Sequence, residues 1–158
     1  MFVSWMERHQ GVVLKVARVF AEFDGDQDDL AQEIRLAIWR SIPNFNNRSK
    51  ASTYIYRIAL NRAITWQRSR RSYRNKMEAY AVEASSSKAD SDRDPRLALV
   101  YHAIRRLDRA ERSIVLMYLE GFKYGEIAET LGLNRNHVGV LINRIKTKLG
   151  KLLKEEAK

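Results

Sequence analysis

Residues 84–95 form a stretch that cannot contribute to a hydrophobic core, and this stretch constrains the fold more than any other. Its sequence, Ala-Ser-Ser-Ser-Lys-Ala-Asp-Ser-Asp-Arg-Asp-Pro, contains no aromatic and no large aliphatic residue. Such a segment buries too little apolar surface to offset the entropy that is lost on ordering. Apolar residues recur at helical spacing on both sides of it. We therefore predict two small domains, residues 1–80 and 95–158, joined by a flexible linker over residues 81–94.

Helices are the only regular secondary structure that the sequence predicts. Pro and Gly, which interrupt helices, number only 2 and 7 in 158 residues. In the first domain, a first helix rich in Val precedes a second helix that Asp28 would cap and Pro43 would end. A long third helix is expected from about Ser52 to Tyr73. The fold class is therefore all-α.

The second domain contains the pattern of a helix-turn-helix. A short amphipathic segment, residues 124–131, precedes a sharp break at Gly132, and a longer helical pattern covers residues 135–153. This order of short helix, glycine turn and longer helix is typical of DNA-binding domains. Asp108 and Glu111 form a capping-box pattern at the start of the preceding helix. The stripe that we expect to be buried in the longer helix comprises Val138, Leu141, Ile142, Ile145 and Leu149.

The net charge of the chain predicts a polyanionic partner. Lys and Arg number 29 against 19 Asp and Glu, which gives a formal charge of +10. Residues 1–80 hold 14 basic and 8 acidic side chains, and residues 95–158 hold 13 and 7, whereas the segment between them has a net charge of −2. Both domains are therefore basic. Nucleic acid is the commonest partner of such a protein, and an anionic membrane surface is the second.

The outward face of the longer helix in the helix-turn-helix has side chains suited to DNA. Asn can pair with an adenine edge, Arg with guanine or phosphate, and a Val methyl group can contact a thymine methyl group. Asn134 would cap this helix, whose N-terminal amides favour a nearby phosphate. The alternative is an ordinary solvated face, which explains the fold but not the charge. The DNA-binding candidates are Arg135, Asn136, His137, Val140, Asn143, Arg144 and Lys146.

The sequence offers no catalytic, metal-binding or cofactor-binding candidates. It has no Cys, no nucleophile–base pair and no phosphate-binding glycine loop. Asp24, Asp26 and Asp28 alternate as in a calcium-binding loop, but Asp29 and Arg35 occupy the positions that this motif gives to Gly and Glu. We therefore expect no enzyme, no cofactor and no small-molecule substrate. A metal-dependent DNA-cutting or DNA-joining enzyme is the weaker alternative.

Two further features concern the cellular location. No apolar run approaches the length of about 20 residues that spans a bilayer. Residues 1–10 lack the charged-then-apolar order of a signal peptide. Because the chain also has no Cys for disulfides, we expect a cytoplasmic protein without membrane insertion.

Segments of both domains resemble bacterial sigma factors of the sigma-70 family. Residues 28–39, Asp-Asp-Leu-Ala-Gln-Glu-Ile-Arg-Leu-Ala-Ile-Trp, are similar to the polymerase-binding segment of that family. Residues 54–62, Tyr-Ile-Tyr-Arg-Ile-Ala-Leu-Asn-Arg, are similar to the promoter-opening segment that follows it. Residues 107–112, 118–128 and 143–149 resemble its C-terminal promoter-binding domain. The order of these segments along the chain and the short linker between the domains resemble those of the two-domain extracytoplasmic-function (ECF) group of sigma factors.

The resemblance implies a transcription initiation factor. Residues 1–80 would bind core RNA polymerase and recognise and melt the minus-ten element of promoter DNA. Residues 95–158 would bind the minus-thirty-five element, and the resemblance also implies an anti-sigma factor as a partner. The alternative is a helix-turn-helix activator or repressor that forms no stable complex with core polymerase. That alternative explains residues 95–158 but leaves the segment 28–62 without a role.

The resemblance also assigns roles to individual residues. Carboxylate, amide and Leu side chains on one helical face would contact the clamp helices of the polymerase. A following loop would hold a base flipped out of the duplex, although turn formation explains the Asn residues of that loop equally well. The polymerase-binding candidates are Asp28, Asp29, Gln32, Glu33 and Leu36. The candidates for the minus-ten element and melting are Phe45, Asn46, Asn47, Arg48, Tyr54, Arg57, Asn61 and Arg62.

The chain departs from the family pattern in the recognition helix. Gly139 and Val140 occupy positions where relatives usually have basic or hydroxylated residues, which implies an altered upstream-sequence preference. Gly in a helix interior costs up to about 1 kcal/mol relative to Ala, and a close approach to the DNA backbone would offset that cost. Tyr54 replaces a Trp that is frequent in the family and keeps an aromatic side chain there.

Overall fold

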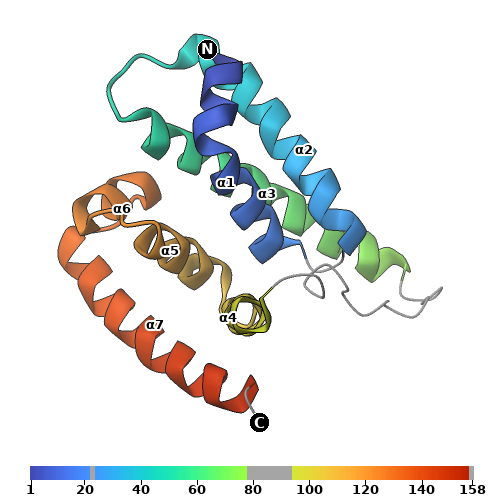
Figure 1. Cartoon of the computed structure of the whole chain (residues 1–158), viewed down its shortest axis with the longest axis vertical. Coiled ribbons are helices and arrows are strands. Elements are labelled where there is room, and N and C mark those ends of the chain that lie inside the picture. Colours follow the sequence, from blue (N-terminus) through green and yellow to red (C-terminus); the bar gives the residue numbers. More distant parts are fainter. Residues whose placement is uncertain (22–23, 78–93, 157–158) are drawn as a thin grey trace. The chain divides into compact units, whose positions relative to one another are not determined.

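The computed structural model describes residues 1–21, 24–77 and 94–156. The predicted linker, residues 81–94, lies outside the described residues except for Asp94. The helices in chain order are α1 (Phe2–Phe20), α2 (Asp24–Ser41), the short 3-10 helix η1 (Ile42–Asn44), α3 (Ala51–Met77), α4 (Pro95–Arg105), α5 (Arg109–Leu119), α6 (Tyr124–Leu131) and α7 (Arg135–Glu156) (Figure 1). No strand occurs in this described part of the chain, which confirms the all-α prediction. None of its helices is long and apolar enough to cross a membrane.

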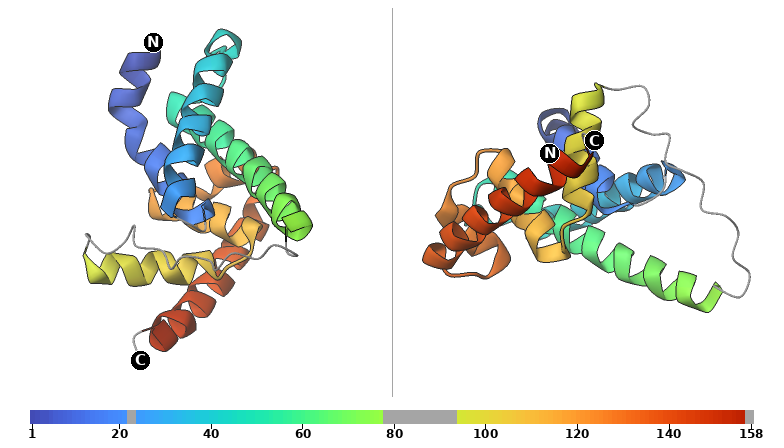
Figure 2. Two further views of the ribbon diagram at one scale, coloured as in Figure 1. Left: turned by 90° about the vertical axis from the view of Figure 1, so that its right-hand side faces the viewer. Right: turned by 90° about the horizontal axis from the view of Figure 1, so that it is seen from below.

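The described residues group into two compact units. The first contains Met1–Arg48 and the part of α3 from Ile58 onward. The second contains Ser49–Arg57 and the helices α4 to α7. The long helix α3, whose continuous course is visible in Figure 2, therefore contributes its beginning to one unit and its remainder to the other.

The first unit is built on the apolar stripes of its helices. Helices α1 and α2 lie side by side (Figure 1). Val16 and Phe20 of α1 are fully buried, as are Leu30, Ile34 and Ile38 of α2. Because these three α2 residues follow steps of four, they form one buried stripe along the helix. Its opposite face remains open for other contacts.

Helix α2 begins earlier than the sequence predicts. It starts at Asp24, so Asp28 is an interior residue of the helix and not its cap. The carboxylates of the first turns interact favourably with the positive end of the helix dipole, which allows the helix to extend back through them. A helical conformation over residues 24–29 also excludes the loop geometry of a calcium-binding motif. The predicted end is confirmed, since α2 ends at Ser41 and Pro43 lies in η1.

The second unit contains the predicted helix-turn-helix. Helix α6 ends at Gly132, whose backbone has the left-handed conformation with a φ of 70°. This conformation suits Gly, which has no Cβ to collide with the adjacent carbonyl oxygen. The amide of Leu133 donates to the carbonyl oxygen of Ala128 over 2.8 Å, which closes the turn. Helix α7 follows directly and buries Val138, Ile142 and Ile145 of the predicted stripe. The other two residues of that stripe, Leu141 and Leu149, are only half-buried because they lie at its edges.

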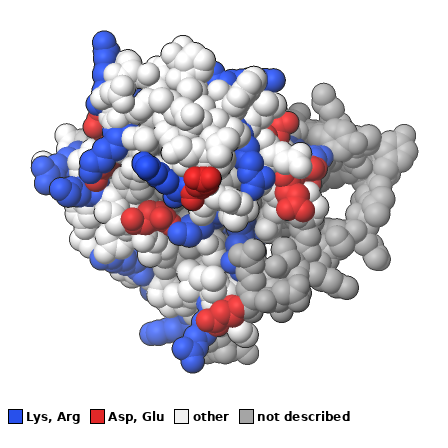
Figure 3. Space-filling view, turned by 45° about the horizontal axis from the view of Figure 1, so that its top comes forward, with Lys and Arg blue, Asp and Glu red and all other residues white. Residues whose placement is uncertain are grey.

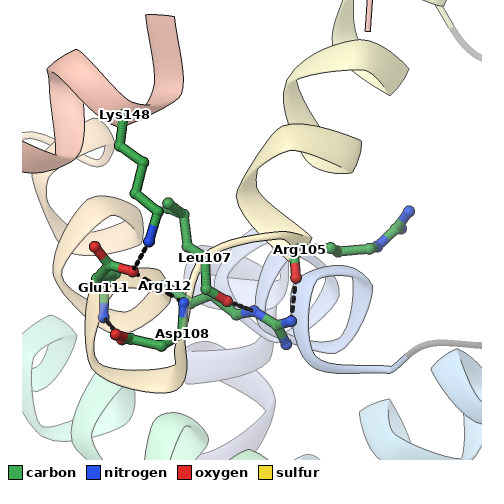
Figure 4. Close-up of polar contacts among 6 residues, drawn as sticks. All are labelled: Arg105, Leu107, Asp108, Glu111, Arg112 and Lys148. Carbon is green, nitrogen blue, oxygen red and sulfur yellow. Dashed lines mark hydrogen bonds and ion pairs between the residues drawn. The ribbon is translucent and has the colours of Figure 1, made fainter. Parts of the chain in front are cut away.

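Helix α5 is fixed at its start by polar contacts (Figure 4). The predicted capping box is confirmed, because the Asp108 carboxylate accepts from the Glu111 amide over 2.8 Å and the Glu111 carboxylate accepts from the Asp108 amide over 3.0 Å. Lys148 of α7 donates to the same Glu111 carboxylate over 2.9 Å. The N-terminal end of α5 is thereby linked to the helix that the sequence assigns to DNA.

Arg112 of α5 holds the connection between α4 and α5. Its side chain is only 9% exposed, and its Nε donates to the carbonyl oxygen of Leu107 over 2.9 Å. Its Nη2 donates to the carbonyl oxygen of Arg105 (Figure 4). These hydrogen bonds to backbone carbonyl groups compensate for the free-energy cost of removing the Arg112 guanidinium from water. Arg112 is therefore a structural residue and not a free contributor to the basic surface.

We expect Arg112→Ala to lower the free energy of unfolding by about 2 kcal/mol, because it removes the side chain that donates hydrogen bonds to two backbone carbonyl groups near the α4–α5 turn. The loss should appear as a lower melting temperature in far-UV circular dichroism. Arg96→Ala, which removes an exposed Arg of α4, is the matched control and should leave the melting temperature unchanged. Equal melting temperatures for both variants would contradict the structural role of Arg112.

We expect Gly132→Ala to destabilise the protein by about 1 kcal/mol, because an Ala in the left-handed conformation is strained. The matched control is Gly150→Ala in α7, where an added Cβ meets no atom within 4 Å and the helix propensity improves. Chemical denaturation of both variants measures the difference. A Gly132→Ala variant as stable as Gly150→Ala would show that the turn does not require Gly.

Candidate nucleic-acid interface and partner surface

The polymerase-binding candidates form one face of α2, opposite the buried stripe. Asp28, Asp29 and Gln32 are exposed, Glu33 is half-buried and Leu36 is 40% exposed. Their spacing of three and four residues keeps them on one side of the helix. An exposed Leu beside carboxylates can contribute apolar contact while the acidic groups attract basic partner residues.

Trp39, which was not among the polymerase-binding candidates, extends this face by one turn. Its side chain is 57% exposed, which is unusual for so large an apolar group. The spacing contained a signal for it, because Trp39 directly follows Ile38 of the buried stripe and so lies outside that stripe. A surface hollow of about 360 Å³ adjoins this face. It is lined by Glu33, Leu36, Ala37, Arg40, Ser41 and Arg62.

An ion pair joins the polymerase-binding candidates to the DNA-binding candidates of α3. The Nη2 atom of Arg62 lies 2.5 Å from an Oε atom of Glu33, with the two side chains 36% and 42% exposed. Arg70, further along α3, lies 3.5 Å from a carboxylate oxygen of Asp26 and 3.8 Å from one of Asp29. Part of the basic character of α3 is therefore directed toward the acidic residues of α2.

The loop before α3 is shaped by its own side chains. Asn46 Oδ1 accepts a hydrogen bond from the Arg48 amide over 3.1 Å, and Asn47 has a left-handed backbone with a φ of 61°. Both observations match the turn chemistry of Asn. Phe45 is half-buried, and its ring meets the ring of Trp5 edge-on with a centroid distance of 5.2 Å. The loop is thereby anchored to α1 in a defined conformation.

The remaining candidates for the minus-ten element lie on α3. Tyr54, Arg57 and Asn61 are three and four residues apart and therefore share one side of the helix. Tyr54 is half-buried, whereas Arg57 and Asn61 are exposed. Within the second unit, Arg57 Nη2 donates to the carbonyl oxygen of Glu129 over 3.3 Å. The structure thus gives Arg57 and Arg62 partners inside the chain that the sequence did not reveal.

All the DNA-binding candidates on α7 are exposed, while Val138, Ile142 and Ile145 of the predicted stripe are buried. Val140, the apolar member of the set, is 48% exposed. Asn134 caps the helix, because its Oδ1 accepts from the Asn136 amide over 2.9 Å. A base-sized partner can therefore approach the first turns of α7 without unfolding any part of the core. Figure 3 shows one face of the molecule, on which Lys and Arg side chains predominate over Asp and Glu.

Tyr118 and Tyr124, which were not among the predicted site residues, lie beside α7. The Nζ atom of Lys146 is 4.6 Å from the centroid of the Tyr118 ring, and hydrogen bonding to Tyr118 raises the pKa of Lys146. The rings of Tyr118 and Tyr124 have a centroid distance of 6.5 Å. A Cβ atom added to Gly139 would lie 3.4 Å from Tyr124 Cε2. Gly139 therefore has a neighbour inside the chain, apart from any contact with DNA.

The chain matches two protein families in succession. Sigma-70 region 2 matches residues 5–73, and Sigma-70, region 4 matches residues 97–149. The first match contains α2 and most of α1 and α3, and the second contains α6 and most of α7. The two matches together cover most of the chain in the order that the sequence resemblance predicted.

Curated relatives cover nearly the whole chain. RNA polymerase sigma factor NccH of Alcaligenes xylosoxydans xylosoxydans is 26% identical over 96% of this chain and 86% of its own length. RNA polymerase sigma factor CnrH of Cupriavidus metallidurans is 28% identical over the same shares. These relatives match both units in a single alignment.

Solved structures share the fold. CnrH in complex with the cytosolic domain of CnrY has a TM-score of 0.71 at 26% identity and covers 98% of this chain and 88% of its own. The sigma factor RpoE in complex with the anti-sigma factor NepR from Bartonella quintana has a TM-score of 0.75 at 19% identity. This match covers 96% of this chain and 97% of that chain. At that lower identity the likeness concerns the fold alone.

Proposed function

Because the chain belongs to the sigma-70 family of bacterial RNA polymerase sigma factors, in its ECF group, we propose a division of labour among its surfaces. The chain directs core RNA polymerase to promoters and initiates transcription by recognising and opening promoter DNA. The observation that carries this function is the ordered match to regions 2 and 4 in one short chain. A helix-turn-helix regulator without a polymerase-binding segment would not account for the match over residues 5–73.

Residues 1–80 form the polymerase-binding and promoter-opening region in this proposal. The exposed face of α2, with Glu33, Leu36 and Trp39, docks on core polymerase. Its support is an apolar patch beside carboxylates on a helix whose other face is buried, which resembles the composition of protein interfaces. The loop Phe45–Arg48 and the exposed side of α3 hold the melted minus-ten element, where basic and amide groups suit a single strand.

Residues 95–158 form the upstream-element region in this proposal. The exposed face of α7, with Asn136, Asn143 and Arg144, enters the major groove as a recognition helix. Amide and guanidinium groups distinguish base pairs there by their donor and acceptor patterns. Residues 81–94 connect the two regions as a linker.

An inhibitor of the anti-sigma class is a further partner in this proposal. Its support is the sequence resemblance, together with the structure of the similar protein CnrH with the cytosolic domain of CnrY. Such a partner would compete with polymerase for the exposed α2 face. We also infer that the chain acts in the cytoplasm, where promoter DNA lies, and that it contributes no catalytic group of its own.

Complex formation with purified core polymerase tests the proposed function. We expect a stoichiometric complex by size-exclusion chromatography when no inhibitor protein is present. The chain should then bind promoter DNA more tightly within that complex than alone. Failure to form a complex with core enzyme would contradict the sigma-factor function and leave the helix-turn-helix regulator as the remaining candidate.

A further inference from the structure

The ring of Tyr124 covers the backbone of the recognition helix at Gly139. A Cβ atom at residue 139 would lie 3.4 Å from Tyr124 Cε2 and 3.7 Å from Cδ2. These distances correspond to ordinary van der Waals contact for a methyl group, so a longer side chain directed toward Tyr124 would displace the ring. Of the seven glycines, Gly139 alone would place a Cβ within 4 Å of another group. The absence of a side chain at residue 139 and the position of Tyr124 are therefore coupled.

The part of the Tyr124 ring nearest to Gly139 is the Cε2–Cδ2 edge. Cε2 is bonded to the carbon atom that carries the phenol oxygen, and the hydroxyl group itself lies more than 4 Å from the position of a Cβ at residue 139. The Tyr124 side chain is 37% exposed. Val140, which follows Gly139, is 48% exposed, and Asn143, one turn further on, is exposed. The ring thus borders the face of α7 that we assign to DNA.

Tyr124 also belongs to the element that suits a phosphate contact. It is the first residue of α6, and in a helix-turn-helix the helix before the recognition helix crosses the DNA backbone. Tyr hydroxyl groups are among the donors that contact DNA phosphates. The neighbouring Tyr118 makes a cation-π contact with Lys146, in which the Lys146 Nζ lies 4.6 Å from the centroid of the Tyr118 ring. Both aromatic side chains thus lie beside α7, Tyr118 at Lys146 and Tyr124 at Gly139.

We propose that Tyr124 contacts promoter DNA by donating its hydroxyl group to a backbone phosphate beside the upstream element, and that the Tyr124 ring keeps its position only while the side chain at residue 139 is no larger than a methyl group. This inference rests on the proposed function of α7. Tyr124 thereby presents a hydroxyl-bearing side chain beside residue 139, which has no side chain of its own. It therefore positions the recognition helix, while Asn143 and its neighbours contact base edges.

Replacing Tyr124 with Phe tests the hydroxyl contact and retains the ring that packs on Gly139. The probe is the duplex that the wild-type chain, bound to core polymerase, enriches most strongly from a randomised library. We expect about fivefold weaker binding, as for the loss of one hydrogen bond, to this duplex and to unselected DNA alike, because a phosphate contact carries no sequence information. Unchanged affinity, or a loss confined to the enriched sequence, would overturn the phosphate contact.

A double-mutant cycle tests the coupling between Tyr124 and residue 139. Gly139→Leu should displace the ring and weaken binding to the enriched duplex by at least about tenfold. In a Tyr124→Ala background, the same substitution should cause less than a twofold further loss, since the space is then empty. Gly150→Leu on the same helix, where an added Cβ meets nothing within 4 Å, controls for helix propensity and should bind as the wild type does.

The outcomes separate this inference from the proposed function. If the wild-type holoenzyme enriches no sequence, the proposed function is wrong and the inference falls with it. If it enriches a sequence but the losses at residues 124 and 139 are additive, the coupling alone is wrong. Circular dichroism of each variant identifies any loss that comes from unfolding. A Gly139→Leu variant that melts below the Gly150→Leu control would also be evidence of steric conflict with Tyr124.

Discussion

Replacing Leu36 with Asp should weaken the complex with core polymerase by about a hundredfold. Leu36 is 40% exposed, so the substitution leaves the core of the first unit intact. It introduces a charge at the centre of the apolar patch that we assign to docking, where central anchors contribute most of the binding free energy. Fluorescence anisotropy of labelled protein titrated with core enzyme measures the change.

Leu14→Asp is the matched control for this experiment. Leu14 of α1 is 43% exposed. The substitution therefore introduces the same charge at a leucine position of nearly equal exposure that lies outside the α2 face. We expect the control to bind core polymerase as the wild type does. Equal binding by both variants would show that the docking surface lies elsewhere, and equal loss would point to a non-specific effect of charge.

Replacing Asn143 with Ala should weaken binding to the upstream promoter element by about tenfold to a hundredfold, because a bidentate base contact contributes about 1–3 kcal/mol of discrimination. Binding to core polymerase should not change, since Asn143 lies on α7 and not on the α2 face. Titration of the holoenzyme with promoter duplex, and with a duplex altered only in that element, measures both affinity and preference.

The control for Asn143→Ala is Gln10→Ala, which removes an exposed amide from α1. It should affect neither DNA binding nor polymerase binding. A loss of polymerase binding in the Asn143 variant would contradict the division of labour between α2 and α7. An unchanged preference for the upstream element would remove Asn143 from the set of base-contacting residues.

The overall fold could be predicted from spacing because burial follows helical periodicity. The stripe of α7 was visible from steps of three and four, and Gly132 and the Asp108–Glu111 capping box indicated a turn and a helix start. The beginning of α2 was predicted wrongly. A run of Asp residues can cap a helix or occupy its first turns, and spacing alone does not distinguish these cases.

The site was predictable as a set of exposed faces but not as a set of contacts. The pair Arg62–Glu33 and the contact of Arg57 with the Glu129 carbonyl join residues far apart in sequence, which no local pattern encodes. The same holds for Tyr124 and Gly139. Sequence reasoning found the glycine unusual but could not find the ring beside it, because that contact depends on how α6 packs against α7.

Transcription in vitro with purified core polymerase, with and without the chain, tests the central claim most directly. On a library of genomic DNA fragments, we expect discrete start sites that depend on the chain and share sequence elements near minus ten and minus thirty-five. Those start sites should disappear with Leu36→Asp and lose their upstream preference with Asn143→Ala. Start sites that are the same with and without the chain would contradict its function as a sigma factor.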